Sequence, residues 1–389
     1  MGLAGSQMND EFLQIFLLLA LGWVGATIGS FLNVVIYRVP LNLSVNEPKR
    51  SFCPKCKNQL KVWQNLPLIS WLLLRGKCHF CKESIPSRYF WVELLTAALF
   101  VAVGWYHGPV AEHPVLIVAL CLWMALLVPI VFIDLEHMII PLSLSLSGML
   151  VGLLTGLWVP EWLGETTWSG GLIDAAIGAS AGFFGIWLVV ELGKKAFGRR
   201  KIEIPEGGKW HLREPETDDD ELQFIIEEEV MNWSDLFSRP SDRLLLNGGS
   251  LTVDGKSKGQ QDVQLFYDRV IFGKKELTIE SLKSLSGTAK DVVIPREAMG
   301  MGDAYLMGMI GALLGWEAVL FTLFVGSLCG IVVAVMGRLG FGSQIPFGPC
   351  LAIGALVWIF GGSQLWELYL SLPQQWNADM ATFSAFSKR

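Results

Sequence analysis

Two aspartates stand where long apolar runs meet polar sequence. Asp303 ends a Gly-x-Gly-Asp motif that begins at Gly300 and leads into the apolar segment 304–316, and Asp134 closes the apolar run 114–133. A carboxylate at the mouth of a hydrophobic helix is costly to desolvate and usually marks a functional site. Gly300 and Gly302 have no Cβ, so they let backbone or a second chain pass close to Asp303. Asp303 alone also fits a plain helix start, where the helix dipole favours an acid.

A pair of such acids has a definite chemistry. Two carboxylates brought together cannot easily both ionise, so the pair holds one acid and one base at neutral pH. One Asp can then deprotonate a water while the other protonates or polarises an amide carbonyl, which is peptide hydrolysis. The pair titrates as a unit, and the sequence does not assign the acid and the base. We therefore predict Asp134 and Asp303 as catalytic residues, with Gly300 and Gly302 shaping the backbone beside them.

Four of the seven cysteines form a second pattern. Cys53 and Cys56 make one Cys-x-x-Cys pair, Cys78 and Cys81 make another, and 21 residues separate the two pairs. This spacing is typical of a tetrahedral zinc site with four thiolates, which has a structural role because no coordination position is left for a substrate. Redox-active or merely buried thiols are the alternative. A disulfide is disfavoured if this loop lies in the reducing cytoplasm.

The elements that carry these residues are membrane helices. The chain is 52% hydrophobic and 17% charged, with 16 Trp, and its mean hydropathy is +0.45. These values predict an α-helical polytopic membrane protein. About 20 apolar residues cross a bilayer. The expected spans are eight: about 11–36, 90–107, 114–133, 141–160, 172–192, 303–315, 317–336 and 347–370. The first run lacks the basic start and the cleavage site of a secretory signal, so we interpret it as a mature span.

The distribution of charge predicts the orientation of the spans. Residues 38–88 contain ten Lys and Arg against two acids, whereas the loops 108–113 and 161–171 contain neither Lys nor Arg. By the positive-inside rule the 38–88 loop faces the cytoplasm. Alternation of the spans then places 134–140 and 193–302 on the same side. Both aspartates are expected at the cytoplasmic mouth of the helix bundle.

Between spans five and six lies a long polar insert. Residues 201–299 contain 20 acids and 13 bases. The part before Arg243 resembles a solvated, partly disordered segment. From Arg243, short alternating runs with Asn247-Gly248 and Asp254-Gly255 indicate strands and hairpins. We predict a β-rich acidic cytoplasmic insert that the chemistry does not require, and its acidity argues against binding nucleic acid.

Two further side chains leave alternatives open. Glu93 lies one turn inside the second span, where it is either a polar partner between helices or a residue near the site. His137 follows Asp134 by one turn and either tunes that acid or is a solvated loop histidine.

These features divide the chain into five regions. The predicted regions are 1–37, the first span; 38–89, a small zinc-ribbon-like cytoplasmic domain; 90–192, spans two to five; 193–299, the insert; and 300–389, spans six to eight.

A set of ordered motifs, together with the cysteines and the two aspartates, resembles one family. The motifs are Gly29-Ser30-Phe31-Leu32-Asn33, Leu66-Pro67-Leu68-Ile69-Ser70-Trp71, Val92-Glu93-Leu94-Leu95-Thr96, Gly300-Met301-Gly302-Asp303 and Ile345-Pro346-Phe347-Gly348-Pro349. The chain is similar to the bacterial type IV prepilin peptidases everywhere apart from roughly 195–292. The resemblance implies a multi-pass aspartyl protease of the inner membrane that removes the basic leader from prepilins and pseudopilins. It also implies methylation of the new N-terminus with S-adenosylmethionine.

Two departures from the family pattern bear on substrate range and regulation. Family members commonly have a Lys two residues after the Gly-x-Gly-Asp aspartate, whereas Tyr305 stands here, and the insert is larger than usual. Other classes of protein also place acids in membrane spans. A carrier would use Asp134 and Asp303 as ion or proton ligands, although no repeated halves of the kind many transporters show are present. A non-catalytic membrane subunit of a pilus or secretion machine is the third hypothesis.

Overall fold

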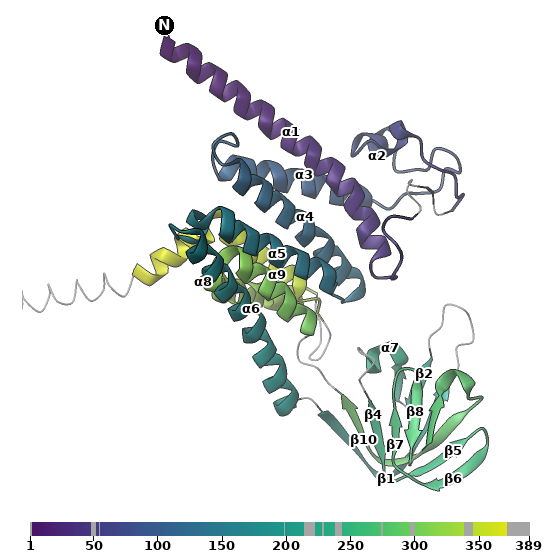
Figure 1. The fold of residues 1–389 in the computed structure, drawn as a ribbon. Coiled ribbons are helices and arrows are strands. Elements are labelled where there is room, and N and C mark those ends of the chain that lie inside the picture. Colours follow the sequence, from purple (N-terminus) through teal and green to yellow (C-terminus); the bar gives the residue numbers. More distant parts are fainter. Residues whose placement is uncertain are drawn as a thin grey trace, which may run out of the picture. The chain divides into compact units, whose positions relative to one another are not determined.

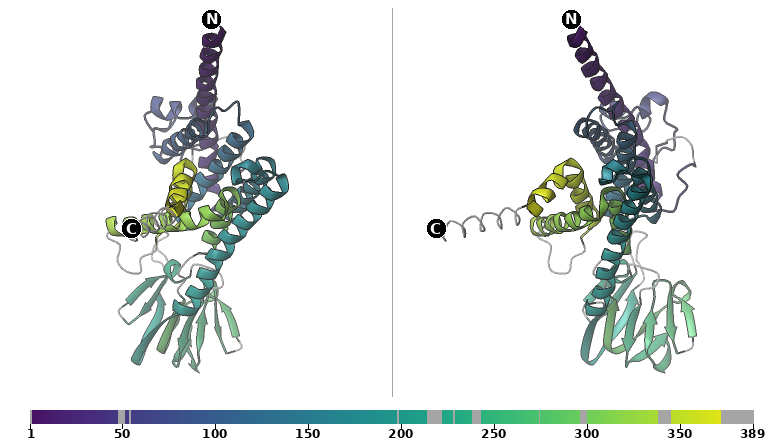
Figure 2. Two further views of the ribbon diagram at one scale, coloured as in Figure 1. Left: turned by 90° about the vertical axis from the view of Figure 1, so that its left-hand side faces the viewer. Right: turned by 60° about the vertical axis from the view of Figure 1, so that its left-hand side comes forward.

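The computed structural model describes residues 2–47, 52–53, 55–197, 199–213, 222–227, 229–237, 243–273, 275–295, 300–337 and 345–371 (Figure 1). Two compact units make up the chain. One comprises Met1–Trp187 with Met301–Arg389, and the other comprises Leu188–Gly300. The first unit is helical and the second is built mainly from β-strands, as Figure 2 shows from two further sides.

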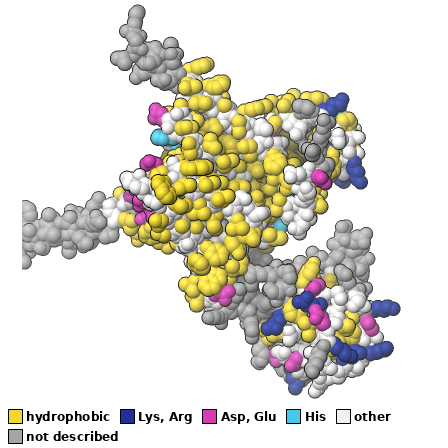
Figure 3. Space-filling model, in the orientation of Figure 1, with side chains coloured by type: hydrophobic (Ala, Val, Ile, Leu, Met, Phe, Trp, Pro, Cys, Tyr) yellow, Lys and Arg dark blue, Asp and Glu magenta, His cyan; other side chains and the backbone are white. Residues whose placement is uncertain are grey.

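Long apolar helices build the first unit. They are α1 (Gly2–Arg38), α3 (Arg88–Tyr106), α4 (Pro114–His137), α5 (Leu142–Trp158), α6 (Trp168–Phe197), α8 (Met301–Met336) and α9 (Gly348–Val357), the last continued by a π-helical turn, η4 (Trp358–Gly362). Within the described residues, six helices are long and apolar enough to cross a membrane, and α5 is shorter. Hydrophobic side chains cover most of the visible face of this unit in Figure 3. The chain is therefore a multi-pass α-helical membrane protein.

A helix lies in each of the eight ranges that hydropathy predicts. The ranges 303–315 and 317–336 form one element, α8, which is broken at Gly315, where φ is 84° and ψ is 171°. Only glycine adopts this backbone conformation readily. Irregular backbone is tolerated at membrane depth only where protein or a water-filled cavity surrounds it. The number of membrane crossings and their direction remain predictions.

Glycines bring the helices of the bundle into close contact. A Cβ on Gly178 of α6 would lie 2.1 Å from the Gly311 carbonyl oxygen of α8, and one on Gly182 would lie equally close to the Met307 oxygen. Membrane helices associate through small residues in this way. The fully buried Trp123 of α4 donates its indole N–H to the Met309 carbonyl at 3.4 Å. The helices that end at Asp134 and begin near Asp303 are thus packed in one core.

A ten-stranded antiparallel sheet forms the second unit. Its order is β3-β2-β1-β10-β4-β7-β8-β9, with β5 pairing both β10 and β6. The strands are β1 (Arg199–Arg213), β2 (Gln223–Ile226), β3 (Glu229–Asn232), β4 (Leu244–Asn247), β5 (Ser250–Val253), β6 (Lys256–Gln260), β7 (Val263–Leu265), β8 (Arg269–Phe272), β9 (Lys275–Thr278) and β10 (Leu285–Pro295). A four-residue helix, α7 (Trp233–Leu236), joins β3 to the rest. The predicted β-rich insert is confirmed.

The prediction for the first part of the insert is wrong. Residues before Arg243 were expected to be solvated and partly disordered, but β1, β2 and β3 lie there. Trp210 and Phe224, both almost fully buried, stack with ring centroids 5.9 Å apart. The high acid content of this stretch obscured its alternation of apolar and polar residues. The acidic run 218–221 lies outside the described residues, as does Glu228 of the second acidic run, 227–229.

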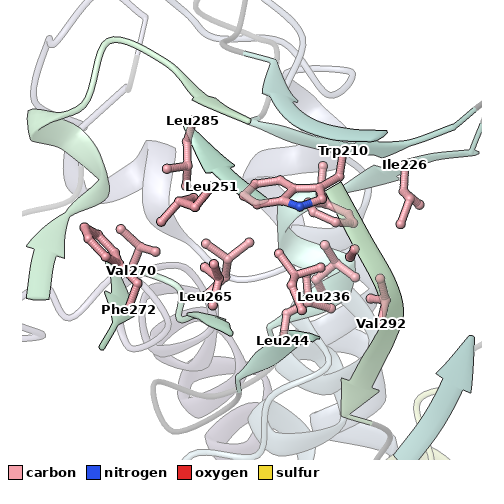
Figure 4. Close-up of a cluster of buried hydrophobic side chains, with 14 of the residues drawn as sticks. Trp210, Ile226, Leu236, Leu244, Leu251, Leu265, Val270, Phe272, Leu285 and Val292 are labelled. Carbon is pink, nitrogen blue, oxygen red and sulfur yellow. The ribbon is translucent and has the colours of Figure 1, made fainter. Parts of the chain in front are cut away.

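The core of the insert follows the period of a β-strand. Every second side chain of β4, β5, β7 and β8 is buried. Figure 4 shows members of this set, among them Leu244, Leu251, Leu265 and Val270, in one cluster with Trp210. Asp254-Gly255 forms the expected two-residue hairpin, because Val253 pairs with Lys256 and both turn residues have positive φ. Asn247-Gly248 does not form a hairpin, because β4 and β5 both pair with β10.

Candidate active site and metal centre

Asp134 lies at the last turn of α4. The helix ends because Met138 adopts a left-handed conformation, with φ at 52°, and its N–H bonds to the Asp134 carbonyl at 2.9 Å. The Asp134 residue is 5% exposed. Its Oδ2 accepts a hydrogen bond of 2.9 Å from the backbone N–H of Gly348. A residue 214 positions along the chain therefore orients this carboxylate.

The contact at Gly348 requires glycine. A Cβ at this position would lie 2.6 Å from Asp134 Oδ2 and 3.3 Å from Ile140 Cδ1. Gly348 is also the first residue of α9, so its N–H belongs to the positive end of that helix. An N–H in this place favours a carboxylate oxygen as its acceptor. The resemblance included Gly348 in its last motif, but no role for this residue was predicted from the sequence.

Asp303 lies in the first turn of α8 and is 8% exposed. A Cβ on Gly302, the residue before it, would lie 2.8 Å from Ile140 Cβ. Ile140 is therefore a shared neighbour of the segment that carries Asp303 and of the Asp134–Gly348 pair. Ile140 thus lies beside the residue that precedes Asp303 and beside the glycine that hydrogen-bonds Asp134.

Glu93 has a partner that the sequence did not predict. This residue of α3 is 8% exposed, and its Oε2 accepts the backbone N–H of Leu68 at 2.6 Å. Leu68 precedes α2 (Ile69–Leu73) in the domain that holds the four cysteines, and it has a positive φ of 60°. We call residues 38–89 the cysteine domain. Glu93 thus attaches the cysteine domain to α3.

A second attachment reaches the helix of Asp134. Arg88, at the start of α3, donates through Nη1 to both carboxylate oxygens of Glu136 in α4, at 2.6 Å to Oε1. Both side chains are partly exposed. His137, by contrast, is exposed, which agrees with the solvated histidine among the two alternatives. The ion pair between Arg88 and Glu136 thus lies two residues along the chain from Asp134.

The four predicted cysteine ligands converge. Their sulfur atoms all lie within 4.8 Å of one another, with 3.8 Å between Cys53 and Cys81 and 4.0 Å between Cys56 and Cys78. A tetrahedral ion with metal–sulfur bonds of about 2.3 Å needs sulfurs roughly 3.8 Å apart. The cluster therefore fits a tetrathiolate metal ion, with sulfur shifts of at most about 1 Å. Backbone N–H groups of Cys81 and Phe80 lower the pKa of the Cys78 thiol to about 7, which favours the thiolate that binds metal.

The two halves of the cluster share one backbone design. In the first, the Cys53 N–H bonds to the carbonyl of Asn58 and the Cys53 carbonyl accepts the N–H of Lys57. The same pattern recurs in the second half, where the Cys78 N–H bonds to the carbonyl of Glu83 and the Cys78 carbonyl accepts the N–H of Lys82. Lys57 and Lys82 occupy equivalent positions with positive φ. This repeated turn aims both sulfurs of each half at one point, which explains the Cys-x-x-Cys spacing.

The fold and the site define a multi-pass membrane protein with two buried acids and a tetracysteine cluster. Comparison of its sequence with known proteins gives matches in two parts of the chain. Residues 23–107 match the bacterial peptidase A24 N-terminal domain, and residues 277–335, which include Asp303, match the type IV leader peptidase family. No solved structure matches. The similar proteins described next are each named prepilin leader peptidase/N-methyltransferase.

The protein of Stutzerimonas stutzeri is 27% identical over 90% of this chain and 93% of its own length. That of Dichelobacter nodosus is 35% identical over 46% of this chain and 67% of its own length. That of Myxococcus xanthus is 43% identical over 46% of this chain, and the match spans half of its length. The chain belongs to the type IV leader peptidase family.

Proposed function

We propose that this protein is a membrane aspartyl endopeptidase that removes the leader peptide from prepilins and pseudopilins, with Asp134 and Asp303 as its catalytic pair. One observation carries the assignment. In a chain of the leader peptidase family, the two acids are both buried, and Ile140 lies beside both Gly302, the neighbour of Asp303, and Gly348, whose N–H bonds to Asp134. Buried carboxylates within apolar helices are costly, and paired acids are the arrangement that peptide hydrolysis uses.

The reaction needs one proton held between the two acids. The ionised Asp takes a proton from a water, whose oxygen attacks the carbonyl carbon of the scissile peptide, while the protonated Asp donates its proton to the carbonyl oxygen. The resulting diol collapses when the first Asp returns its proton to the amide nitrogen and the second Asp takes back a proton from a diol hydroxyl. The C–N bond then breaks, which leaves a carboxylic acid and an amine. The Gly348 N–H fixes Oδ2 of Asp134, so Oδ1 of Asp134 serves the water or shares the proton with Asp303.

The site and the cysteine domain belong on the cytoplasmic face of the inner membrane. The ten Lys and Arg between residues 38 and 88 support this orientation. A substrate with a soluble leader and an apolar helix can present its cleavage site at such a mouth while the helix stays in the bilayer. This placement also gives the cysteines a reducing environment, in which thiolates are available for metal.

The cysteine cluster supports a structural zinc ion bound by Cys53, Cys56, Cys78 and Cys81. When bound, the ion would hold the two Cys-x-x-Cys turns together, and four thiolates complete its coordination. The names of the relatives support a second activity, transfer of a methyl group from S-adenosylmethionine to the new N-terminal amine. We assign no residue to the methyl donor.

Intact-mass analysis of a prepilin substrate tests the proposal. Wild-type protein should remove the leader, and with S-adenosylmethionine the product should gain one methyl group. Asp134→Asn and Asp303→Asn should each lower the cleavage rate by at least about 10²-fold, because each loses one half of the acid and base pair. An unchanged substrate with folded wild-type protein would favour a carrier or a non-catalytic subunit. Cleavage without methyl transfer would remove only the second activity.

A further inference from the structure

A short helix of the cysteine domain divides its side chains between two directions. In α2, Trp71 points inward: its ring lies 5.2 Å from that of Phe90 in α3 and closes over Gly76. Ile69, Leu72 and Leu73 are 42%, 57% and 71% exposed. Exposure of three aliphatic side chains on a helix of five residues is unfavourable in water. We therefore expect another surface to cover this face.

The attachment of α2 to α3 sets its depth in the molecule. The hydrogen bond from Leu68 to Glu93 holds the start of α2 beside a residue five positions into α3. At about 1.5 Å per residue, this point lies roughly 7 Å along the helix axis. Trp91, in the same first turns of α3, is 56% exposed, and exposed Trp residues collect where a membrane helix meets the headgroups. The apolar face of α2 therefore lies level with the first turns of a membrane-spanning helix.

The surroundings of this face are basic. Lys61, Arg75 and Lys77 flank α2 in sequence and are exposed. The whole loop 38–88 has ten basic residues against two acidic ones. Figure 1 shows α2 in the segment that joins α1 to α3, and in Figure 3 Lys and Arg side chains gather at that edge beside the apolar surface of the bundle. Apolar side chains bordered by cations match an anionic lipid surface.

We propose that α2 docks on the anionic phospholipid surface of the membrane, with Ile69, Leu72 and Leu73 at the boundary of headgroups and acyl chains. Lys61, Arg75 and Lys77 contact the phosphates. A basic leader peptide would be repelled by the same charges, which is why the surface fits lipid better than it fits the substrate's soluble end. The docking adds a third attachment of the cysteine domain, after those at Glu93 and Arg88. It is independent of the peptidase assignment.

Photocrosslinking of the full-length protein tests the docking directly. A benzophenone amino acid replaces Leu73, and the protein is reconstituted in phosphatidylcholine vesicles with or without phosphatidylglycerol. We expect lipid adducts by mass spectrometry, several-fold more abundant with phosphatidylglycerol and reduced by high salt. The matched control carries the same group at Tyr267 of the insert, which is 57% exposed and should form few lipid adducts. Protein or substrate adducts at position 73, without lipid adducts, would overturn the proposal.

The lipid dependence of leader cleavage tests the same surface in a functional assay. The double variant Leu72→Gln and Leu73→Gln should lose the dependence of leader cleavage on phosphatidylglycerol, whereas Leu72→Met and Leu73→Met should keep it. Bound zinc per chain reports whether each variant retains a folded cysteine domain. Equal rates of wild type in the two vesicle types would contradict the functional consequence. The crosslinks are formed without substrate, so failed docking and failed peptidase activity give separate results.

Discussion

At the scale of single residues, the site depends on a contact that sequence spacing does not reveal. Asp134 and Asp303 could be predicted because acids at the ends of apolar runs are unusual. Gly348 could not, because its N–H reaches Asp134 only after the last helix has packed against α4. Ile140, an ordinary aliphatic residue, likewise gains meaning only from its contacts with Gly302 and Gly348. Sequence thus identifies costly residues more readily than the neighbours that orient them.

Gly348→Ala tests whether this contact positions the carboxylate. The new Cβ would lie 2.6 Å from Asp134 Oδ2, so either the carboxylate or the start of α9 must move. A displacement of about 1 Å in a catalytic group costs up to roughly 10²-fold in rate. We expect a loss of that order in kcat for leader cleavage with a smaller change in KM. Gly185→Ala is the matched control, since a Cβ there meets nothing within 4 Å. Equal kcat values for the two variants would show that Gly348 does not position Asp134.

At the scale of elements, the cysteine domain is joined to two helices, α3 and α4. Hydropathy separates the domain from the spans, and the Cys-x-x-Cys pairs predict its cluster. The attachments of the domain could not be predicted, because each joins residues that come together only in the folded chain. These pairs are Leu68 with Glu93 and Arg88 with Glu136. The sequence suggested two uses for Glu93, and its side-chain hydrogen bond with Ser30 of α1 agrees with the polar partner between helices. The acceptor role toward Leu68 was not predicted. Charge alone does not indicate which partner a buried acid will have.

The ion pair between Arg88 and Glu136 should respond to charge reversal as a pair. Arg88→Glu and Glu136→Arg each place like charges together at the end of α4, which should lower thermal stability and leader cleavage. The double variant restores the pair in reverse and should recover a coupling of about 1 kcal/mol, the usual size for partly exposed ion pairs. Thermal unfolding in detergent and cleavage rates measure the cycle. Additive effects of the two changes would show that the pair contributes nothing.

Loss of the metal should loosen the cysteine domain before it affects the acids. Cys78→Ser removes one of the four sulfurs, so bound zinc, measured by mass spectrometry of the metal, should fall from about one per chain to near zero. Proteases should then cut within 38–89 faster than in wild type. Cleavage of the leader should decline less than in Asp134→Asn, because the cluster supports α3 and α4 rather than the reaction itself. The control is Cys121→Ser in α4, which should leave the zinc content unchanged.

At the scale of the whole molecule, the chain combines a membrane unit with a separate β-rich unit. The change of pattern near residue 193 was visible in the sequence, and so were the strands after Arg243. The first three strands were missed because net charge dominated the interpretation and the alternation around Trp210 and Phe224 was short. What no local pattern could give is the pairing of β1 with β10, strands at opposite ends of the insert.

This pairing predicts that the insert can be removed. Arg199 and Pro295 are partners in neighbouring antiparallel strands, whose Cα atoms lie about 5 Å apart. The insert therefore enters and leaves at adjacent points, and a short Gly-Ser linker in place of 199–295 can join the flanking segments without strain. The core of the insert consists of its own side chains, so its removal takes no side chain from the core of the helical unit.

Leader cleavage by the deletion variant should stay within about threefold of wild type, a change of roughly 0.6 kcal/mol in the activation free energy. The same deletion combined with Asp303→Asn provides the inactive control. If the deleted protein inserts in the membrane and binds zinc but does not cleave, the insert contributes to the reaction or to substrate binding. Retained cleavage of one prepilin with loss of another would instead assign the insert to substrate choice.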